Sequence, residues 1–512
     1  MGKAVLGIDV GTSGTRSLVV GRDGKLIAQA TAPHALSHPR PSWSEQDPAE
    51  WWQAAVKSVR EALSRSSLSG EDIAAVGLSG QMHGLVMLDK DNEIIRPAIL
   101  WNDQRTAREC AEIEEGFGRE KLIEIACNPA LPGFTAPKIA WVQKNEPKAW
   151  ERTAHILLPK DYVRLHLTGE YATDVADGSG MLLLDIKKRN YSGEILSFLE
   201  IDEKLLPKVF ESPEVTGKVT PRAAEATGLA EGTPVVGGAG DQAAAAVGNG
   251  IVRGGAICAT LGTSGVVFAA TDEPLIDVPR GRVHTFCHAV PGKWHVMGVV
   301  LAAGGSLQWV RNELAEAEKA AAEERGIDVY EVLCDKARFT PPGAEGLIFL
   351  PYLTGERSPI NDPHARGAWI GLTVRHTKGH LVRAVVEGAS FAMRDCLEVL
   401  KELGGEIKDI RLSGGGAVSE LWRSVQAAVY NRPVSLLEVS EGSAYGAALL
   451  AMAGGGFHAS VEETCDAVVR TTGEAKPDPA AAAVYEKLFP VYRECYRQLK
   501  DQLHALDEPA QG

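Results

Sequence analysis

The sequence predicts an α/β protein built from two similar units, and three observations support this fold class. The first is a succession of three short apolar strands, one helix and a further strand within residues 4–78. The second is a Gly-Thr-Ser-Gly turn between two apolar strands, which occurs at residues 11–14 and again at 262–265. The third is a glycine content of 54 in 512 residues, against an average of about 7% in globular proteins. Together these features indicate a duplicated unit whose strands end in glycine-rich turns.

The first unit opens with three strands joined by glycine-containing turns. These strands are predicted at residues 4–9, 15–20 and 26–31. A helix follows, for which Asp47 is the expected N-cap, Pro48 fits the first helical position and Glu50 completes a capping-box pattern. A further apolar strand at residues 73–78 runs into the segment Ser-Gly-Gln-Met-His-Gly at 79–84. The expected order is therefore three strands, a helix and a strand.

The second unit is predicted to begin near residue 254 and to repeat the order of strand, turn and strand. Its strands are expected at 256–261, 266–270, 410–412 and 433–437, and its helices at 380–403, 420–430, 444–453 and 480–506. The strand at 410–412 enters Gly414-Gly415-Gly416, which fits either a nucleotide-binding loop or a tight strand-to-helix turn. Residues 474–479 are predicted to form a loop before the last helix.

Composition limits the classes of partner. The formal net charge is −14, which argues against a nucleic-acid or an anionic membrane partner in general. The eight cysteines contain no Cys-x-x-Cys pair, so neither a zinc site nor a redox motif is indicated, and reduced thiols are expected. The first strand contains Asp9, which does not fit a signal peptide, and no uncharged apolar run is long enough to span a bilayer. A cytoplasmic location is expected.

Two lone carboxylates stand out. Asp9 is the only charged residue within 4–15, and Asp241 is the only one within 232–252. A carboxylate in such a segment is costly to bury unless it is paired, hydrogen-bonded or near a metal. A helix cap or turn is the alternative interpretation for either residue alone. Because both follow strand-like segments and lie beside glycines, the sequence favours a functional role, with Asp241 as a general base or a metal-associated carboxylate.

The two Gly-Thr-Ser-Gly turns have the composition of an anion site. Glycine permits backbone conformations in which successive N–H groups converge, and leaves no side chain in the way. Additional hydroxyl donors come from Thr12, Ser13, Thr263 and Ser264. Two such turns could hold opposite sides of a polyphosphate, although each turn alone also fits an ordinary hairpin.

A dinucleotide-binding site is a rival interpretation at residues 237–243. The pattern Gly238-x-Gly240-x-x-Ala243 follows a strand and opens a helix, as in a Rossmann fingerprint. That fingerprint also requires an acidic residue about 20 positions later. Residues 242–271 contain neither Asp nor Glu, so a nicotinamide-dependent dehydrogenase is disfavoured.

Two longer patterns resemble those of the FGGY family of carbohydrate kinases, which belongs to the actin/sugar-kinase superfamily. Residues 133–141 (Gly-Phe-Thr-Ala-Pro-Lys-Ile-Ala-Trp) resemble the first signature of this family, and residues 367–387 resemble the second. The resemblance extends to about residue 455. Shorter segments are most similar to the family members that phosphorylate D-xylulose, namely 43–48, 80–84, 101–103, 158–162 and 355–357.

The resemblance implies two actin-like domains, each with an RNase-H-like core, and a nucleotide cleft between them. The implied bounds are a sugar-binding domain at 1–248, a nucleotide-binding domain at 249–456 and a helical extension at 457–512. The resemblance also implies ATP and Mg²⁺ as cofactors, D-xylulose as the sugar, and a protein that could form a homodimer.

Site residues follow from the resemblance by position. Asp241 is implied as the catalytic base and Asp9 as the residue that positions the Mg²⁺–phosphate group, so both are expected near the metal. The residues implied at the sugar are Met82, His83, Asp103, Asp241 and Gln242. Those implied at the phosphates are Gly11, Thr12, Ser13 and Arg16 on one side and Gly262, Thr263 and Ser264 on the other. Gly415 and Gly416 are expected against the adenosine.

The predicted reaction is phosphoryl transfer from ATP to the terminal hydroxyl of D-xylulose, assisted by Asp241. Two alternatives remain open at this point. One is a related ketose or polyol kinase of the same fold, acting for example on ribulose. The other is an actin-like ATPase or nucleotide-dependent binding module that phosphorylates no sugar. A hinge between the two domains is expected near residues 248–255.

Overall fold

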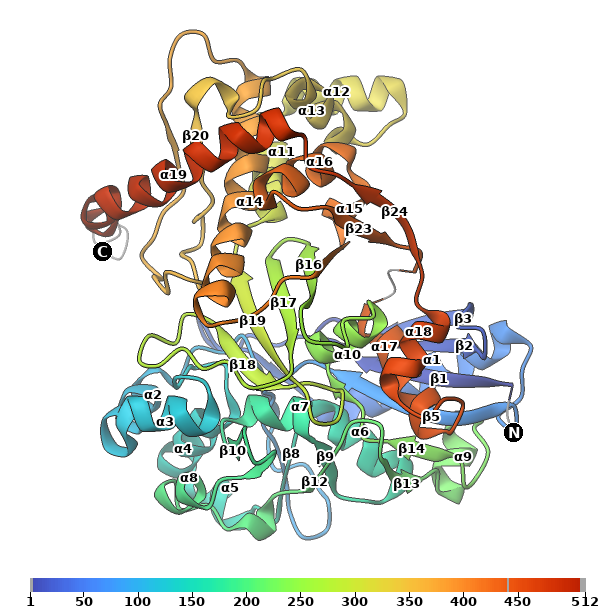
Figure 1. The fold of residues 1–512 in the computed structure, drawn as a ribbon. Helices are drawn as coiled ribbons and strands as arrows, with labels where there is room; N and C mark the ends of the chain where they lie inside the picture. The colour runs from blue at the N-terminus through green and yellow to red at the C-terminus, as the bar shows by residue number, and fades with distance from the viewer. Residues whose placement is uncertain (1–2, 440–441, 507–512) are drawn as a thin grey trace.

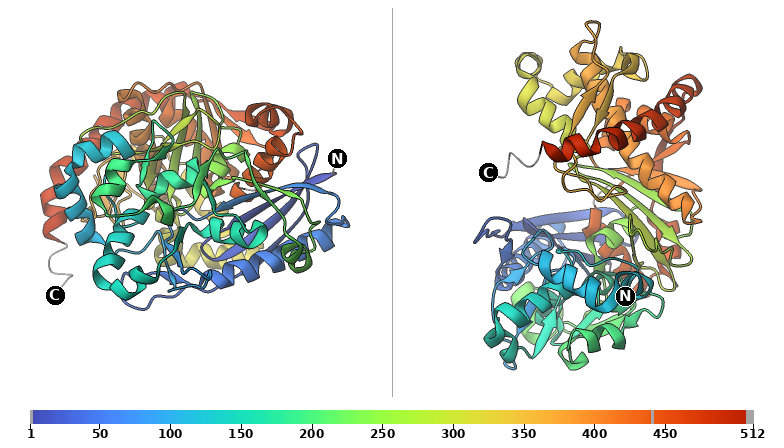
Figure 2. Two further views of the ribbon diagram at one scale, coloured as in Figure 1. Left: turned by 90° about the horizontal axis from the view of Figure 1, so that it is seen from below. Right: turned by 90° about the vertical axis from the view of Figure 1, so that its left-hand side faces the viewer.

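The computed structural model describes residues 3–439 and 442–506, and the chain folds into two lobes (Figure 1). The lower lobe in Figure 1 contains the blue to green elements of the N-terminal half, and the upper lobe contains the yellow and orange elements of the C-terminal half. The view from the side also separates the lobes (Figure 2). Each lobe is built on a mixed β-sheet with helices against it, so the predicted two-domain α/β fold class is confirmed.

The N-terminal sheet has the strand order β13-β14-β5-β1-β2-β3, and β15 also pairs with β5. Its strands are β1 (Ala4–Val10), β2 (Gly14–Gly21), β3 (Leu26–Pro33), β5 (Ile73–Gly80), β13 (Val215–Lys218), β14 (Pro234–Val236) and β15 (Ala239–Gly240). The first three strands are antiparallel neighbours, whereas β1, β14 and β15 each run parallel to β5. The predicted order of three strands, a helix and a strand is confirmed.

The C-terminal sheet has the order β18-β19-β17-β16-β22-β23-β24. Its strands are β16 (Ala256–Leu261), β17 (Gly265–Thr271), β18 (His284–Cys287), β19 (Trp294–Val300), β22 (Asp409–Ser413), β23 (Val434–Leu437) and β24 (Thr471–Ala475). As in the first sheet, a meander of three antiparallel strands (β16, β17, β19) adjoins a parallel strand, β22. The duplication is therefore real at the level of topology. The loop predicted at 474–479 is wrong at its start, because Glu474 and Ala475 pair in β24 with β23.

Helix α1 (Pro48–Ser66) covers the N-terminal sheet and begins as predicted. The Asp47 carboxylate accepts a hydrogen bond from the Ala49 N–H at 2.9 Å, and Pro48 occupies the first helical position. Glu50 does not complete a capping box. Its carboxylate instead accepts from the Ala35 N–H at 2.8 Å, because the chain after β3 passes beside the start of the helix.

The remaining helices divide between the two lobes. Those of the N-terminal half are α2 (Ala107–Ile113), α3 (Arg119–Ala126), α4 (Thr135–Asn145), α5 (Pro147–Arg152), α6 (Pro159–Thr168), α7 (Val175–Gly178), α8 (Gly193–Phe198), α9 (Pro221–Thr227) and α10 (Asp241–Gly248). Those of the C-terminal half are α11 (Gly304–Leu314), α12 (Glu316–Arg325), α13 (Val329–Arg338), α14 (Lys378–Glu402), α15 (Gly415–Val418), α16 (Glu420–Tyr430), α17 (Gly442–Gly454), α18 (Val461–Val468) and α19 (Pro479–Ala505). Short two- and three-residue strands complete the structure: β4 (Glu45–Gln46), β6 (Val86–Leu88), β7 (Ala98–Ile99), β8 (His155–Leu157), β9 (Ala172–Asp174), β10 (Leu184–Asp185), β11 (Asn190–Tyr191), β12 (Lys208–Phe210), β20 (Ile348–Leu350) and β21 (Ala368–Ile370).

Helix α17 comes from the C-terminal half of the chain but packs on the N-terminal sheet, beside β1 and β5 (Figure 1). Glycine makes this approach close. A Cβ atom at Gly77 would lie 1.9 Å from the Ala447 carbonyl oxygen, and one at Gly446 would lie 1.7 Å from the Ala244 carbonyl oxygen in α10. The small residues of α17 therefore join the two halves. The predicted domain bounds at residues 248 and 456 stay a prediction.

The lobes also share an apolar core. One face of the C-terminal sheet, with Phe268, Phe286 and Met297, is buried in the same cluster as Leu85 and Phe134 of the N-terminal half. The C-terminal sheet thus packs against the N-terminal lobe. Across residues 3–439 and 442–506, no helix is long and apolar enough to cross a membrane.

Candidate active site

Three parallel strands of the N-terminal sheet end side by side, and they bring most of the predicted sugar-site residues together. Asp9 in β1 is in register with Ser79 in β5, and Gly80 of β5 is in register with Gly240 of β15. Beyond these positions the chain continues into Met82 and His83 after β5, and into Asp241 and Gln242 after β15. Ligand sites of α/β proteins lie at the carboxyl ends of parallel strands, so the topology supports a site here.

Asp241 is the first residue of α10. Its Oδ1 atom accepts a hydrogen bond from the Gln242 N–H at 2.8 Å. Burial, together with the charge of Asp9, raises the pKa of Asp241 to about 7. A carboxyl group with a pKa near the working pH suits a general base, because it is partly ionised and still basic enough to take a proton.

Asp9 is the second carboxylate of this cluster. Burial raises its pKa, while the hydroxyl groups of Ser443 and Ser79 and the charge of Arg16, its cross-strand neighbour, lower it. Its Oδ1 atom is buried and has no hydrogen-bond partner among the described residues. A buried carboxylate oxygen without a donor is available to a cation or to a ligand group.

His83 presents a neutral imidazole to the site. Its φ angle is +70°, a conformation that is uncommon for residues other than glycine. Nδ1 lies 2.7 Å from the Gly180 carbonyl oxygen, which can only accept, so Nδ1 carries the hydrogen and Nε2 is an acceptor. Burial lowers the pKa of His83 to about 3 and keeps the ring uncharged.

Two residues that hold His83 were not assigned a role from the sequence. The His83 carbonyl oxygen accepts from Lys138 Nζ at 2.8 Å and from Thr135 Oγ1 at 3.0 Å. Lys138 also donates to the Gly133 carbonyl oxygen at 2.7 Å, and its side chain is fully buried. The available signal was a lysine inside an apolar stretch of the first signature, since lysine is rarely fully buried without a partner.

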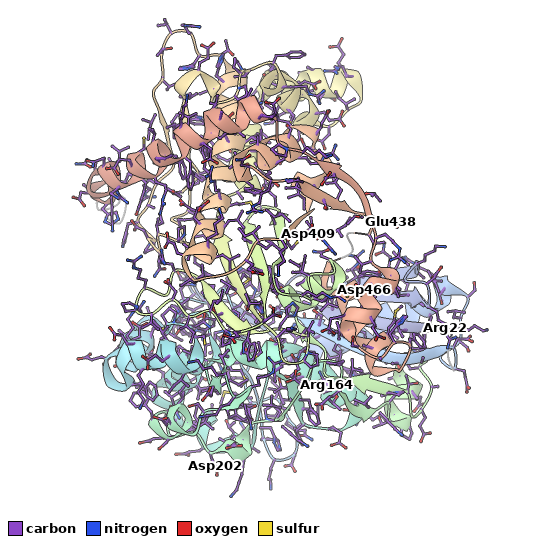
Figure 3. All side chains as sticks on the ribbon, in the orientation of Figure 1. Arg22, Arg164, Asp202, Asp409, Glu438 and Asp466 are labelled. Carbon is purple, nitrogen blue, oxygen red and sulfur yellow. The ribbon has the colours of Figure 1, made fainter. Side chains whose placement is uncertain are left out.

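A buried charged cluster lies directly behind the strand ends. Lys160 Nζ contacts Asp161 at 2.6 Å and Asp174 at 2.7 Å, and all three side chains are fully buried. Arg164, labelled in Figure 3, donates to the Val236 carbonyl oxygen at 2.7 Å and also to that of Gly237. Val236 ends β14, four residues before Gly240. The cluster therefore fixes the chain that leads to the N-terminus of α10.

The N-terminal Gly-Thr-Ser-Gly turn is held from outside. The Thr12 carbonyl oxygen accepts from Gln46 Nε2 at 2.6 Å, and Gln81 Nε2 donates to Gln46 Oε1 at 2.8 Å. Trp101 Nε1 donates to Thr12 Oγ1 at 3.1 Å, and the side of the indole is open, with 42% of the residue exposed. Trp101 is therefore not a core residue. Ser13 is exposed at the tip of the turn.

The two other residues of this lobe that are predicted at the phosphates, Gly11 and Arg16, already make hydrogen bonds. The Gly11 N–H donates to the Gly14 carbonyl oxygen at 3.1 Å, which closes the turn. Arg16 Nε donates to Gln29 Oε1 at 3.1 Å on the neighbouring strand β3. The structure therefore places both residues beside Asp9, and their direct contact with a phosphate stays a prediction.

The C-terminal turn borders a cavity of about 670 Å³. Four predicted nucleotide residues line this cavity: Gly262, Thr263, Gly415 and Gly416. Apolar and aromatic side chains such as Leu307 and Trp422 form part of its wall, and charged side chains such as Asp328, Glu331 and Arg338 form another part. The predicted residues thus meet at one hollow of a size and lining that suit a small aromatic ligand group.

Glycine is required beside this cavity. Gly414 has a φ angle of +76°, and a Cβ atom there would lie 2.7 Å from the Leu261 carbonyl oxygen. The turn itself, including Ser264, is exposed, and the N–H groups of Gly304 and Gly305 donate to the Gly262 and Thr263 carbonyl oxygens at 3.0 and 2.8 Å. The start of α11 therefore supports the turn and leaves its outer side open.

Asp103 differs from the other predicted sugar residues in how fully its carboxylate is engaged. It is fully buried, and its carboxylate accepts from the Ser44 N–H at 2.6 Å and from Arg105 Nε and Nη2 at 2.9 and 2.7 Å. With its oxygens engaged in this way, Asp103 supports the neighbouring chain. A direct contact between Asp103 and a sugar hydroxyl stays a prediction.

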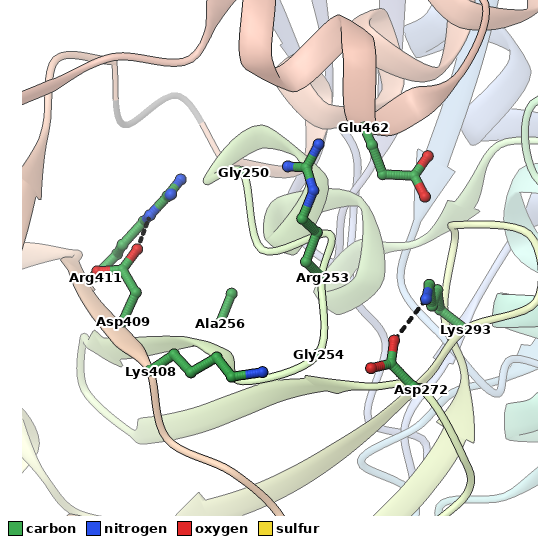
Figure 4. A pocket seen from close by; sticks show the side chains of 10 residues that line it. All are labelled: Gly250, Arg253, Gly254, Ala256, Asp272, Lys293, Lys408, Asp409, Arg411 and Glu462. Atoms are coloured by element: carbon green, nitrogen blue, oxygen red, sulfur yellow. Dashed lines mark hydrogen bonds and ion pairs between the residues drawn. The ribbon is translucent and has the colours of Figure 1, made fainter.

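A second cavity, of about 550 Å³, lies where the chain passes from one half to the other (Figure 4). It is bordered by Gly250 and Gly254 and by charged side chains that are already paired. Figure 4 shows two of these pairs, Lys293 with Asp272 at 2.5 Å and Arg411 with Asp409 at 2.8 Å. This cavity contains none of the predicted site residues.

Comparisons with known proteins cover both halves of the chain. The FGGY family of carbohydrate kinases matches residues 4–248 through its N-terminal domain and 257–454 through its C-terminal domain. The chain is 38% identical over 504 residues to the xylulose kinase of Bacillus subtilis, covering 98% of this chain and 99% of that protein. It is 39% identical over 495 residues to the xylulose kinase of Escherichia coli, covering 96% and 99%. The crystal structure of xylulose kinase from Rhodospirillum rubrum has a TM-score of 0.90 at 32% identity, covering 98% of this chain and 100% of that one.

Proposed function

Because the chain belongs to the FGGY family of carbohydrate kinases, we propose that it transfers the γ-phosphoryl group of ATP to D-xylulose, forming D-xylulose 5-phosphate and ADP. The similarity to xylulose kinases over nearly the whole length supports this choice of sugar. The observation that carries the proposal is the Asp241 carboxyl group, whose pKa of about 7 and position beside Asp9 and Met82–His83 suit base-assisted transfer to a hydroxyl. A homodimer and a cytoplasmic location stay predictions.

The nucleotide would bind between the two glycine turns. The cavity of about 670 Å³ next to Gly415 and Gly416 includes apolar and aromatic side chains against which an adenine ring can pack. The phosphates would extend from there toward Gly262–Ser264 and across to the turn at Gly11–Ser13. Backbone N–H groups and hydroxyls are well suited to this task in a chain whose net charge is −14.

The sugar would lie against the N-terminal strand ends. The neutral His83 ring offers Nε2 as an acceptor for one sugar hydroxyl, since Nδ1 is engaged with Gly180. Met82, 6% exposed, supplies an apolar wall beside Gly240. Gln242, adjacent to the base, can donate to or accept from a second hydroxyl.

The proposed reaction proceeds by an in-line displacement. The Asp241 carboxylate accepts the proton of the terminal hydroxyl as that oxygen bonds to the γ-phosphorus, and the bond from the γ-phosphorus to the β,γ-bridging oxygen of ATP breaks. ADP leaves, and the proton remains on Asp241 until it passes to solvent. Such transfers gain most of their rate from positioning and electrostatic stabilisation, with base assistance contributing about 10²–10⁴-fold.

The carboxylates also fit the Mg²⁺ ion that phosphoryl transfer uses. Mg²⁺ prefers oxygen ligands and is held in such enzymes by one or two carboxylates together with substrate phosphates. Asp9, with a buried Oδ1 that lacks a donor, and Asp241 supply such carboxylates. Asp9 and Asp241 would hold the ion, which would neutralise charge on the phosphates.

A panel of acceptors tests the proposal. ADP formation is followed in a coupled assay with ATP and D-xylulose, D-ribulose, glycerol or no acceptor, with the Asp241→Asn variant as the control for contaminating kinases. The proposal expects the highest kcat/KM with D-xylulose and almost no turnover without a sugar. A preference for D-ribulose supports the related ketose kinase, and equal ADP formation without a sugar supports an ATPase.

A further inference from the structure

The segment Gly355-Glu356-Arg357 is fixed against the end of β19, although nothing above gives it a function. Glu356 Oε1 accepts from the N–H groups of Leu301 and Arg357, both at 2.8 Å. The Ser358 N–H donates to the Val299 carbonyl oxygen at 2.9 Å. The backbone around Arg357 therefore has a defined place next to residues 299–301.

This place adjoins the phosphate turn of the C-terminal lobe. Val300 is in register with Gly265, the residue that follows Gly262–Ser264. The chain after Leu301 reaches Gly304 and Gly305, whose N–H groups hold the same turn. Arg357 thus belongs to the wall of the C-terminal lobe that meets the N-terminal lobe.

The Arg357 guanidinium has no ligand of its own. It is half-buried, and within residues 3–439 and 442–506 no hydrogen bond or ion pair engages it. Burial lowers its pKa, against the opposing charge of Glu356. A guanidinium that pairs with no neighbouring side chain keeps its N–H groups available to the acceptors of a ligand.

Arg357 lies on the sugar side of the site. The Ser358 N–H binds Val299, two residues beyond Met297, with which His284 of β18 is in register, so residue 358 follows His284 along the same edge of β19. Consistent with this place, the charge of Arg357 lowers the pKa of both His83 and His284. His83 and His284 pack on the same ring, with Phe134 centred 4.8 Å from His83 and 6.0 Å from His284. Arg357 therefore lies on the His83 side of the sugar site.

We propose that Arg357 binds the sugar, donating N–H groups to the carbonyl-bearing end of the ketose, opposite the hydroxyl that is phosphorylated. The inference rests on the proposed function and adds to it a sugar contact from the C-terminal lobe. Guanidinium groups only donate, which matches the carbonyl oxygen, an atom that only accepts. Because His83 lies on one lobe and Arg357 on the other, a bound ketose bridges the lobes.

Steady-state kinetics of Arg357→Met and Arg357→Lys test this role. The matched control is Arg375→Met, a C-terminal lobe arginine whose side chain is 76% exposed and pairs with Glu345 at the surface. Loss of a hydrogen bond from a charged donor is expected to lower kcat/KM for D-xylulose about 10- to 100-fold in Arg357→Met, chiefly through a higher KM. Arg357→Lys is expected to fall between that variant and the wild type. The KM for ATP and the slow hydrolysis of ATP without sugar are expected to stay at the wild-type level in all three variants.

Two outcomes overturn the inference. An unchanged KM for D-xylulose in Arg357→Met removes the sugar contact, and a raised KM for ATP with slower sugar-free hydrolysis places the guanidinium on the phosphates instead. If thermal melting shows that Arg357→Met is unfolded, Arg357→Lys decides by the same criteria. A wild-type protein that does not phosphorylate D-xylulose refutes the proposed function instead, and the variants are then compared on the sugar that it does phosphorylate.

Discussion

Replacing Asp241 by Asn separates the catalytic role of this side chain from its structural role. The amide oxygen of Asn can still accept the Gln242 N–H bond of 2.8 Å, and the side chain keeps its shape at the start of α10. The base, however, is lost. We expect kcat to fall by about 10²–10⁴-fold, the usual contribution of a general base.

The same substitution is expected to stabilise the fold at alkaline pH. Burial and the charge of Asp9 raise the pKa of Asp241 from 3.8 to about 7. The folded state therefore binds this proton more tightly than the unfolded state, and the stability of the wild type falls as the pH rises from 3.8 toward about 7. Three pKa units correspond to at most ~4 kcal/mol, and partial exposure of the side chain reduces this to about 1–2 kcal/mol.

Two assays on the same samples provide the test. Initial rates at saturating ATP and D-xylulose are measured by coupled ADP detection, and melting temperatures are measured at pH 8. The control is Asp501→Asn, at an exposed carboxylate on α19, which is expected to change neither quantity. Activity of Asp241→Asn within about tenfold of the wild type would contradict the role of Asp241 as the base. A lower melting temperature at pH 8 would contradict the expected stabilisation.

Three further predictions follow from contacts around the site. Lys138→Met removes one hydrogen bond to the His83 carbonyl oxygen and one to that of Gly133. Because only the first of these holds His83, the KM for D-xylulose is expected to rise by about tenfold, the effect of losing one hydrogen bond; an unchanged KM contradicts this. Burial raises the pKa of Glu356 from 4.5 to about 8. The free energy of unfolding in urea is therefore expected to fall between pH 6 and 8 by about 2 kcal/mol more in the wild type than in Glu356→Gln. An equal fall in both proteins argues against this. If residues 248–255 act as a hinge, D-xylulose with a non-hydrolysable ATP analogue is expected to lower the radius of gyration in small-angle scattering, and an identical curve excludes closure.

The strands and the two main carboxylates could be predicted because their signals are local. Apolar runs that end in Gly-Thr-Ser-Gly define β1, β2, β16 and β17, and both sheets then repeat one pairing scheme. Asp9 and Asp241 were conspicuous as single charges in apolar segments. A buried charge at a strand end is costly unless a partner or a ligand stabilises it. The topology brings these two carboxylates together.

Residues whose role depends on distant partners could not be predicted. Lys160 looks like an ordinary surface lysine in the sequence, and the apolar neighbours of Lys138 do not show what it binds. Both are fully buried, Lys138 under His83 and Lys160 among Asp161 and Asp174. The same holds for Glu50, whose carboxylate binds the Ala35 N–H rather than completing a cap. Only the folded chain shows which acceptor a flexible polar side chain reaches.

Packing of α17 is a further example. The sequence predicts a helix from the small residues of α17, but it does not predict the place of this helix on the N-terminal sheet. There, Gly77 and Gly446 allow carbonyl groups of neighbouring elements to approach. Glycine within a strand or helix interior weakens the element by itself. The close approach between elements explains why the structure keeps glycine at these positions.

Phosphorylation of D-xylulose at its terminal hydroxyl is tested most directly by ³¹P NMR of the products formed from ATP and D-xylulose. One new phosphomonoester signal is expected, coupled to the C5 protons of the sugar and equal in amount to the ADP formed. Accumulation of inorganic phosphate with ADP, and no sugar ester, would contradict the proposed function.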